Sequence, residues 1–540
     1  MTFIETPVLS KELPNLAIHG SHNATVVLEY QGRILEIIEF ERLLDSKNIG
    51  YCQYMAAQSR KHLAHIVLDY IKDKYNFDHF DTVLHQHCDS NDNTFTETVM
   101  LYHYNNLFPA NKQVPMGHHA AHAAGSFYQS SFDKSIIFSF DGGGNDGWFN
   151  VYLGERENGI KLIQKNDSLD LGFAYMIFGE YLEDIRREPA LSLGNLVYAG
   201  KILGYQSYGE CQYSWYDAVK EFYLSKPSGN NYQALFDILG EKIGLRFDVN
   251  NRLTGSQAKN LAATSQKVFE DIFFEMADKY VKEYELPICL AGGCALNIVL
   301  NTKIKQRYGL PVFIGPNPND CGIATGMMLQ CLKPMEPYDT SYLGIPVMDK
   351  NMLPRYIEQR RGDKLYIDAI VNDLVAEKII GVVQNNSEHG PRALGNRSII
   401  CSPINPNMKD ILNKKVKDRE WYRPFAPIVR LEDVSEYFEW EGPSEFMSFC
   451  PQVKQKYKSI IPSITHVDGT ARVQTVTREK NPFIYDLLTR FKERTRVGVL
   501  INTSFNVNGR PILSSYSDAF EVYDKTELDC LYLDGWYFRK

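Results

Sequence analysis

Two copies of one strand pattern constrain the fold of this chain more than any other feature. Residues 16–40 read as a strand, a polar loop, a second strand, a turn and a third strand. Residues 135–164 repeat that order, with the sequence DGGGND as the polar loop. The strands are rich in β-branched and aromatic residues, and the turns contain the residues that hairpins need. Two units in the same order indicate an internal duplication.

Helices and strand–helix units follow the repeats. Such units collect their loops at one edge of a sheet, which is where ligands bind. We therefore interpret residues 1–345 as one α/β domain made of two related halves. Apolar periodicity predicts helices at 54–75, 171–193 and 256–284, and strand–loop–helix units at 286–304 and 312–330.

Residues 346–540 are predicted to form a second α/β domain. Four prolines fall between positions 334 and 354, a density typical of a connector. A helical segment and the strand IIGVVQN come next. From Arg392 to Arg430, nine Lys or Arg stand against three Asp or Glu, whereas the whole chain has a formal net charge of -8. Such a local excess indicates an anionic partner or a solvated face.

Composition excludes several classes of protein. With 44% hydrophobic and 23% charged residues, the chain is neither disordered nor fibrous. Its acidic balance argues against a DNA coat protein or a polybasic membrane binder. The ten cysteines include no C-x-x-C pair, and the longest apolar stretch is too short to span a bilayer. We expect a cytoplasmic protein with reduced thiols and no membrane partner.

Residues 116–128, MGHHAAHAAGSFY, form a candidate metal-binding helix. Its alanines favour a helix, and His118 and His122 at i, i+4 offer two imidazoles on one face. His119 is three residues from His122 and can face the same cavity as a base or ligand. The alternative is a helix with ordinary surface or core histidines. Three of thirteen histidines within five positions favour a functional role.

Two imidazoles alone rarely hold a catalytic metal, so carboxylates should converge on them. Asp141 ends the strand SIIFSF, and Asp320 ends the loop GPNPND before a helix. Each has a structural alternative, Asp141 as a turn former and Asp320 as a helix cap. Two histidines with two aspartates would suit iron, manganese or zinc, and the residues do not choose between them.

Glycine loops and a lysine are candidate phosphate contacts. The pairs Gly142-Gly143 and Gly292-Gly293 stand where strands turn, so backbone N–H groups can approach phosphates. Lys201 can pair with a phosphate, although an exposed lysine is the default expectation. Single glycine loops are weak signals.

The basic residues of the second domain suggest a nucleotide-phosphate cradle. Arg392 and Arg397 have planar guanidinium groups suited to phosphate. Amide and hydroxyl groups end the strand VGVLI. The alternative is a nucleic-acid groove, for which Trp421 and Tyr422 are present as aromatics that could stack on bases. The further residues of the predicted cradle are Lys417, Arg419, Arg423, Arg472, Asn502, Thr503 and Ser504.

These motifs together resemble the NodU/CmcH-type O-carbamoyltransferases over nearly the whole chain. The resemblance is carried by GSHNATVVLEY, HHAAHAAGSFY, FDGGGNDG, AGGCALN, GPNPNDCGIATG, GPRALGNRSI, KDREWYRPFAP and INTSFN. It implies an actin/sugar-kinase/heat-shock-like duplicated first domain and a YrdC-like second domain. The family usually has His-Asp in the first motif, where this chain has His22-Asn23.

The resemblance also implies a reaction and its site residues. The second domain would make carbamoyl-AMP from carbamoyl phosphate and Mg-ATP. The first domain would transfer the carbamoyl group to an acceptor hydroxyl beside a divalent metal. The resemblance implies iron as this metal, with manganese or zinc as alternatives. The metal ligands fall on His118, His122, Asp141 and Asp320, and the proton-transferring histidine on His22 or His119. The residues that bind ATP and carbamoyl phosphate fall on Arg392, Lys417, Arg472, Asn502 and Ser504. The contacts to the carbamoyl adenylate fall on Gly142, Gly143, Lys201, Gly292, Gly293 and Asn297.

Partners and rival functions remain open at this point. ATP, carbamoyl phosphate and a hydroxylated small molecule are the expected partners, and a nucleotide or nucleic-acid acceptor and a homodimer are also compatible with the sequence. One rival is a nucleic-acid-modifying (threonyl)carbamoyltransferase, which a salt-sensitive binding assay would reveal. The other is a small-molecule kinase of the same superfamily, which would release ADP rather than AMP.

Overall fold

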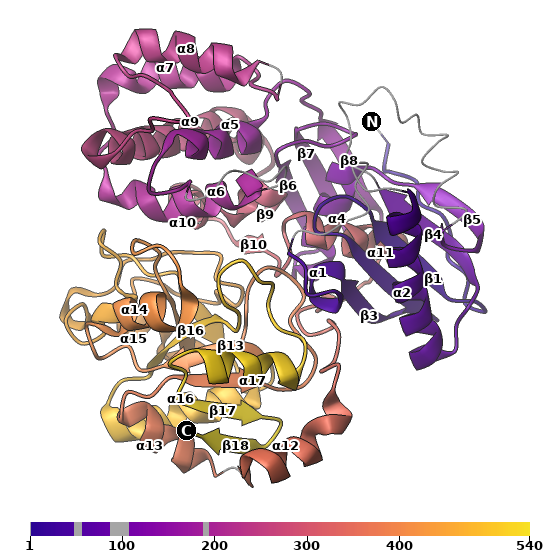
Figure 1. Cartoon of the computed structure of the whole chain (residues 1–540). Coiled ribbons are helices and arrows are strands. Elements are labelled where there is room, and N and C mark those ends of the chain that lie inside the picture. The colour runs from indigo at the N-terminus through magenta and orange to yellow at the C-terminus, as the bar shows by residue number, and fades with distance from the viewer. Residues whose placement is uncertain (1, 48–56, 87–106, 187–193, 230, 365) are drawn as a thin grey trace. The chain divides into compact units, whose positions relative to one another are not determined.

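The computed structural model describes residues 2–47, 57–86, 107–186, 194–229, 231–364 and 366–540 (Figure 1). Its contacts divide the chain into two compact units. The first unit consists of Met1–Glu41, Asn48–Asn297 and Ile304–Thr340, and the second of Arg42–Lys47, Ile298–Lys303 and Ser341–Lys540. Among the helices of the described ranges, none is long and apolar enough to cross a membrane.

The first unit contains two five-stranded sheets of the same topology. Their strand orders are β3-β2-β1-β4-β5 and β10-β9-β6-β7-β8. In each sheet three strands form an antiparallel meander, and two later strands run parallel beside the first strand of the meander. The predicted internal duplication is therefore confirmed. The strands are β1 (Asn15–His19), β2 (Thr25–Tyr30), β3 (Arg33–Glu39), β4 (Phe80–Gln86), β5 (Ala110–Pro115), β6 (Lys134–Phe140), β7 (Phe149–Glu155), β8 (Gly159–Gln164), β9 (Ile288–Ala291) and β10 (Val312–Ile314).

Two helices, α4 (His118–Gln129) and α11 (Ile323–Leu332), pack on each other between these sheets. Although α4 follows the first sheet in the chain, it packs on strands of the second sheet, and α11 packs on strands of the first. Every residue of α4 is buried. A Cβ added at Gly326 of α11 would lie 1.9 Å from the backbone oxygen of Ala121 of α4. Only glycine allows the two helices to approach this closely.

Gly326→Ala should therefore destabilise the first unit by about 1–3 kcal/mol, the usual range for an overpacked core. The new methyl group meets backbone, which cannot move aside as a flexible side chain can. Thermal or urea unfolding of the full chain measures the change. Gly200→Ala is the matched control, because Gly200 also lies in a helix, α6, and a Cβ there meets nothing within 4 Å. Equal stability of the two variants would contradict the assigned packing.

The segment between β8 and β9 forms a helical layer of the first unit (Figure 1). Aromatic rings pack at its centre, with Phe222 and Phe236 having ring centroids 4.5 Å apart and Phe178 lying 5.1 Å from Phe222. These rings hold the layer together by burial of large apolar surfaces. Its helices are α5 (Leu171–Ile177), α6 (Tyr198–Tyr205), α7 (Tyr213–Leu224), α8 (Tyr232–Ile243) and α9 (Gly255–Tyr284).

The prediction of one helix over 171–193 is wrong. The α-helix ends at Ile177 and continues as a 3₁₀ turn to Tyr181. Leu182 then adopts an extended conformation and forms a parallel bridge with Leu253. This long-range pairing satisfies backbone groups that a continued helix would have used. Residues 187–193 of the predicted helix lie outside the described residues.

The other predicted elements of the first unit are found. The described part of the 54–75 prediction, whose first three positions lie outside the described residues, is α2 (Ala57–Tyr75), and the 256–284 prediction is α9. The strand–loop–helix units are β9 with α10 (Ile298–Tyr308) and β10 with α11. A short helix, α1 (Phe40–Leu43), follows the first meander.

The second unit is built on one mixed eight-stranded sheet. Its order is β11-β18-β17-β12-β13-β16-β14-β15. The predicted strands IIGVVQN and VGVLI lie in its central part as β12 and β16. Its strands are β11 (Asp363–Lys364), β12 (Ile380–Val383), β13 (Arg397–Cys401), β14 (Ala426–Arg430), β15 (Gln474–Val476), β16 (Val499–Ser504), β17 (Cys530–Leu533) and β18 (Trp536–Arg539), and its helices are α12 (Leu353–Arg360), α13 (Ile367–Val375), α14 (Met408–Ile411), α15 (Val434–Tyr437), α16 (Pro482–Thr495) and α17 (Tyr516–Lys525).

Candidate metal centre and cation-lined site

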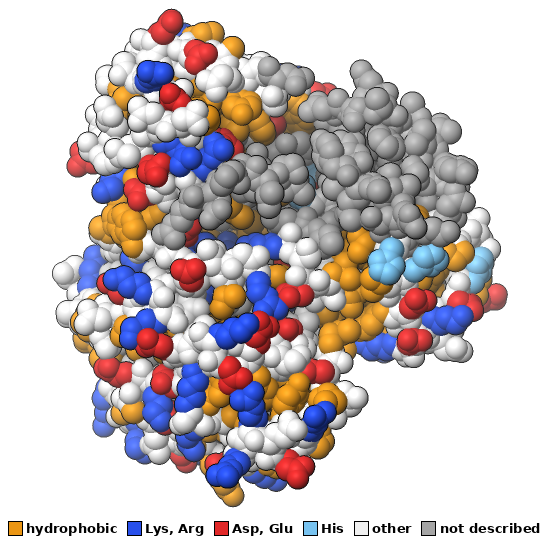
Figure 2. All heavy atoms as spheres, in the orientation of Figure 1, with side chains coloured by type: hydrophobic (Ala, Val, Ile, Leu, Met, Phe, Trp, Pro, Cys, Tyr) orange, Lys and Arg blue, Asp and Glu red, His pale blue; other side chains and the backbone are white. Residues whose placement is uncertain are grey.

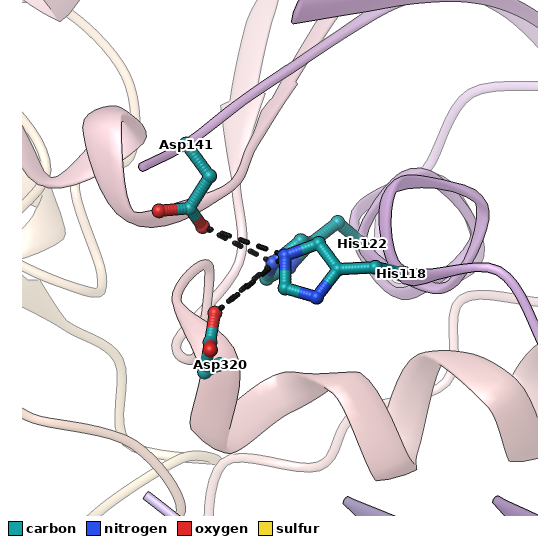
Figure 3. A group of neighbouring side chains, drawn as sticks. All are labelled: His118, His122, Asp141 and Asp320. Atoms are coloured by element: carbon teal, nitrogen blue, oxygen red, sulfur yellow. Dashed lines mark ion pairs between the residues drawn. The ribbon is translucent and has the colours of Figure 1, made fainter. Parts of the chain in front are cut away.

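Four side chains of the first unit converge on one point (Figure 3). Nε2 of His122 lies 3.2 Å from Oδ2 of Asp141 and 3.4 Å from Oδ1 of Asp320. Nε2 of His118 lies 4.0 Å and 3.8 Å from the same two oxygens. Such spacings suit ligands placed about 2.0–2.2 Å from one shared tetrahedral ion. We call these four residues the His–Asp set.

The fold brings the His–Asp set together from three places in the chain. His118 begins α4 and His122 follows one turn later, so both imidazoles lie on one face of the helix. Asp141 directly follows β6. Asp320 begins the 3₁₀ turn that leads into α11. Because α4 packs against both β6 and α11, the ends of these elements meet.

Both glycine pairs hold the carboxylate of Asp141. The backbone N–H of Gly142 donates to Oδ1 at 2.7 Å, and that of Gly293 donates to Oδ2 at 2.6 Å. Gly292 has a φ of +89°, and a Cβ there would lie 2.1 Å from the carbonyl oxygen of Phe140. These glycines therefore allow the close backbone approach that orients a member of the His–Asp set. Gly143, by contrast, has nothing within 4 Å of an added Cβ.

Electrostatics favour a positive charge at the centre of the His–Asp set. Burial lowers the pKa of His122, but the hydrogen bonds and charges of Asp141 and Asp320 outweigh it and raise the pKa to about 9. Burial raises the pKa of Asp320, but the surrounding histidines outweigh this effect and hold it well below its ordinary value. Burial also holds the pKa of His118 well below its usual range. An ionised carboxylate and a neutral imidazole are both competent metal donors, so the residues present fit a divalent cation.

His119 lies beneath the loop that follows Asp141. It is fully buried (0% exposed), and its Nδ1 forms a 2.8 Å hydrogen bond with the hydroxyl of Ser139. A Cβ added at Gly144 would lie 2.9 Å from its Nε2, so this loop covers the ring. Burial also lowers the pKa of His119. The ring is therefore placed to support the loop rather than to meet an incoming acceptor.

His22 reaches the His–Asp set from the loop between β1 and β2. Its side chain is 29% exposed, and its Nε2 lies 3.4 Å from Oδ2 of Asp320. Its Nδ1 lies 3.1 Å from Oδ1 of Asn23. The amide of Asn23 can present either its oxygen or its NH₂ group to Nδ1, so this contact leaves both tautomers of the half-buried imidazole open. Of the two histidines considered as proton acceptors, His22 is the more exposed.

Lys201 and Asn297 make contacts within the first unit that the sequence did not suggest. Nζ of Lys201 donates to the backbone oxygen of Ile185 at 2.9 Å. The amide of Asn297 pairs with the amide of Gln266 in both directions, at 3.0 and 3.2 Å. Both side chains thus help to order the helical layer around the first unit's loops.

In the second unit, Lys417 ends a π-helical segment, Leu412–Lys417. It is only 4% exposed, and its Nζ donates to the backbone oxygens of Ser504 and Asn506 at 2.6 and 2.7 Å and to Oδ1 of Asn506 at 2.6 Å. Burial, followed by the charges of Arg419 and Arg423, holds its pKa well below the ordinary value. An anion bound beside Lys417 would favour the charged ammonium over the neutral amine.

Four arginines share this environment. Burial and then the charge of Arg423 lower the pKa of Arg392 to about 10. Arg472 is likewise affected by burial and then by its neighbours Arg392, Arg419 and Arg423. Glu420 lies 3.6 Å from Arg423 and offsets part of this charge. We call Arg392, Lys417, Arg419, Arg423 and Arg472 the cation-lined site, and its excess of positive charge fits a polyphosphate.

Two residues of the predicted cradle are fully buried. Arg397 is fully buried and donates to the backbone oxygens of Gln384, Asn385 and Asn396. The prediction that it binds phosphate is therefore wrong, because its guanidinium is used to brace a loop. Asn502 is also fully buried, and its Nδ2 donates to Ala393 O and to the side-chain oxygen of Gln474.

The outer surface of the second unit contrasts with its cation-lined site. Figure 2 shows Lys and Arg interspersed with Asp and Glu on the visible face of this unit, which is orange to yellow in Figure 1. Exposed pairs include Arg360 with Asp524 and Lys415 with Glu527, each 2.7 Å apart. Positive charge is balanced on this face and unbalanced in the cation-lined site. Arg419, Arg423 and Asn506 are missing from the functional residues implied by family resemblance, although the basic run 413–423 was a signal for the two arginines.

Comparison with protein families gives two matches that together cover most of the chain. A family described as Carbamoyltransferase N-terminus matches residues 21–329, and one described as Carbamoyltransferase C-terminus matches residues 371–540. Nodulation protein NolO of Bradyrhizobium diazoefficiens is 34% identical over 79% of this chain and 79% of its own length. The 3'-hydroxymethylcephem-O-carbamoyltransferase of Streptomyces clavuligerus is 34% identical over 52% of this chain and 53% of its own.

Among solved structures, the similarity is weaker. HypF of T. kodakarensis superposes with a TM-score of 0.37 at 14% identity, covering 61% of this chain and 49% of that chain. At this level of similarity the fold is better described by the strand orders of the chain itself.

Proposed function

The chain belongs to the carbamoyltransferase family, and from this premise we propose that it makes carbamoyl-AMP from carbamoyl phosphate and ATP and passes the carbamoyl group to an acceptor hydroxyl. Family membership makes the chain an enzyme that transfers a carbamoyl group. The observation that supports two successive steps is the presence of two chemically different sites, the cation-lined site in the second unit and the His–Asp set in the first.

The cation-lined site supports the adenylation step. Carbamoyl phosphate is hydrolysed to carbamate and inorganic phosphate, and a carbamate oxygen then attacks the α-phosphorus of Mg-ATP and expels pyrophosphate. Negative charge accumulates on the phosphate oxygens in this step. Buried Lys417 and half-buried Arg392 and Arg472 are cations that would stabilise this charge with little reorganisation of solvent. Asn502 and Ser504, at the end of β16, would complete the substrate contacts.

The His–Asp set supports the transfer step. Its residues would hold a divalent ion, with iron as the first expectation from family resemblance and manganese or zinc as alternatives. Such an ion, when bound, supplies a Lewis acid for the carbamoyl carbonyl. A ring nitrogen of His22 would accept the proton of the acceptor hydroxyl, whose oxygen bonds to the carbamoyl carbon as AMP departs. His119, covered by the loop after Asp141, is not assigned this role.

The acceptor is proposed to be a hydroxylated small molecule. One relative is named for acting on a hydroxymethyl cephem, so a hydroxymethyl group is a reasonable first acceptor class to test. A nucleotide or nucleic-acid acceptor is the second candidate. A small-molecule kinase would not use the cation-lined site of the second unit.

Two further assignments complete the proposal. Residues 346–540 would perform adenylation and residues 1–345 transfer. A cytoplasmic location is supported by the cysteines, none of which forms a disulfide within the described residues. A homodimer stays a prediction.

The test is incubation of the full chain with Mg-ATP, carbamoyl phosphate and a panel of hydroxylated acceptors. Mass spectrometry should detect an acceptor that has gained one carbamoyl group, and AMP and pyrophosphate should form in equal amounts. Formation of ADP with a phosphorylated acceptor would instead support a kinase and overturn the proposal.

A further inference from the structure

A buried histidine of the first unit, His19, takes no part in the chemistry proposed above. It ends β1, and its side chain is 0% exposed. Its Nδ1 lies 2.8 Å from Oε1 of Gln86, the last residue of the neighbouring parallel strand β4. Its Nε2 lies 3.2 Å from the backbone oxygen of His22 and 3.6 Å from Oδ2 of Asp320. One imidazole thus contacts both a member of the His–Asp set and the loop that holds the proposed base.

The surroundings of His19 require a hydrogen on Nε2. Both oxygens that face this atom, the carbonyl of His22 and the ionised carboxylate of Asp320, can only accept hydrogen bonds. The amide of Gln86 can present either its oxygen or its NH₂ group to Nδ1, because the two ends of an amide are interchangeable in outline. In either arrangement Nε2–H donates to the loop of His22 and points toward Asp320.

Asp320 stands between two groups of imidazoles. Its Oδ1 faces His122 at 3.4 Å and His118 at 3.8 Å. Its Oδ2 faces His22 at 3.4 Å and His19 at 3.6 Å. His19 belongs to the first sheet, whereas Asp320 leads into α11. At 3.6 Å this contact is electrostatic rather than a full hydrogen bond, and it favours a carboxylate plane that keeps Oδ1 within the His–Asp set.

We propose that His19 is a positioning residue whose Nε2–H orients the Asp320 carboxylate and the His22 loop together. The metal-binding oxygen and the proton-accepting imidazole would then keep one fixed spacing. The inference rests on the proposed metal site and transfer step. Loss of such an outer partner typically weakens metal binding by about 10–100-fold.

Two substitutions of His19 separate this role from general packing. His19→Gln keeps a donor near the position of Nε2, whereas His19→Asn keeps a polar group near Nδ1 and loses the Nε2 donor. The full chain is titrated with Co²⁺ as the probe, and the dissociation constant, the visible absorption of bound Co²⁺ and the thermal midpoint are measured. We expect His19→Asn to weaken Co²⁺ binding about 10–100-fold and to change its absorption, and His19→Gln to stay within about threefold of wild type.

His85→Asn is the matched control. His85 is also buried, on β4, but its register partner is Ile18, so it points to the opposite face of the sheet from His19. It should leave Co²⁺ binding unchanged. If the Gln and Asn variants of His19 bind Co²⁺ alike, the positioning role is wrong. If His118→Ala also binds Co²⁺ as wild type does, the metal site itself fails, whereas failure confined to the His19 variants leaves the proposed function intact.

Discussion

Lys417→Ala should abolish ATP-dependent pyrophosphate release, with a loss of at least about 100-fold, the effect of removing one preorganised charge-stabilising donor. The ammonium group is buried, and its described contacts are to neutral oxygens of Ser504 and Asn506. Burial holds the pKa of Lys417 well below its ordinary value, and the phosphates of ATP would favour its charged form. The measurement is pyrophosphate formation from Mg-ATP and carbamoyl phosphate by the full chain.

Lys415→Ala provides the control for Lys417→Ala. Lys415 lies in the same π-helical segment but is exposed and pairs with Glu527 at 2.7 Å. Its loss should leave pyrophosphate release nearly unchanged, because exposed ion pairs contribute little. Lys417→Met preserves apolar volume if the alanine variant fails to fold. Undiminished pyrophosphate release in a folded Lys417 variant would remove the adenylation assignment.

His118→Ala should remove bound metal and carbamoyl transfer while leaving pyrophosphate release intact. The two reactions are assigned to different units, and His118 contributes a donor atom only to the His–Asp set. Loss of a direct ligand should cost more than the about 10–100-fold typical of an outer partner. Elemental analysis of the purified protein measures the metal, and acceptor carbamoylation measures the transfer.

His79→Ala is the corresponding control. His79 lies in the first unit but is exposed, and its Nε2 contacts Oδ1 of Asn111 at 2.9 Å. Metal content and transfer should both match wild type in this variant. Equal metal content in His118→Ala and wild type would refute His118 as a ligand, and a parallel loss of pyrophosphate release would refute the separation of the two steps.

The sequence predicted the features that depend on neighbouring residues, namely the strands, the turns and the helical spacing of the histidines. Alternating apolar residues, separated by turn residues, predicted both meanders. The i, i+4 spacing of His118 and His122 predicted that both imidazoles lie on one face of a helix. Asp141 and Asp320 were found because each follows a strand whose end lies at a common sheet edge.

The features that the sequence did not predict depend on contacts between residues that are far apart in the chain. Gly293 is 152 positions from the carboxylate to which it donates, so its role in orienting Asp141 could not be inferred from spacing. The burial of His119 depends on a loop folding over it, and the bracing role of Arg397 depends on three backbone oxygens that turn toward it. The early end of the helix at Ile177 likewise reflects pairing of Leu182 with a distant residue.

The equal strand orders of the two sheets bear on the origin of the chemistry. The first hairpin loop of one half carries His22, and the corresponding loop of the other half carries Asp141. The last strand of one half leads to His118, and that of the other leads to Asp320. Equivalent positions inherited from one ancestral copy thus hold different side chains. Duplication thus paired the loops of the two halves, and their divergence left a histidine in one loop and an aspartate in the other.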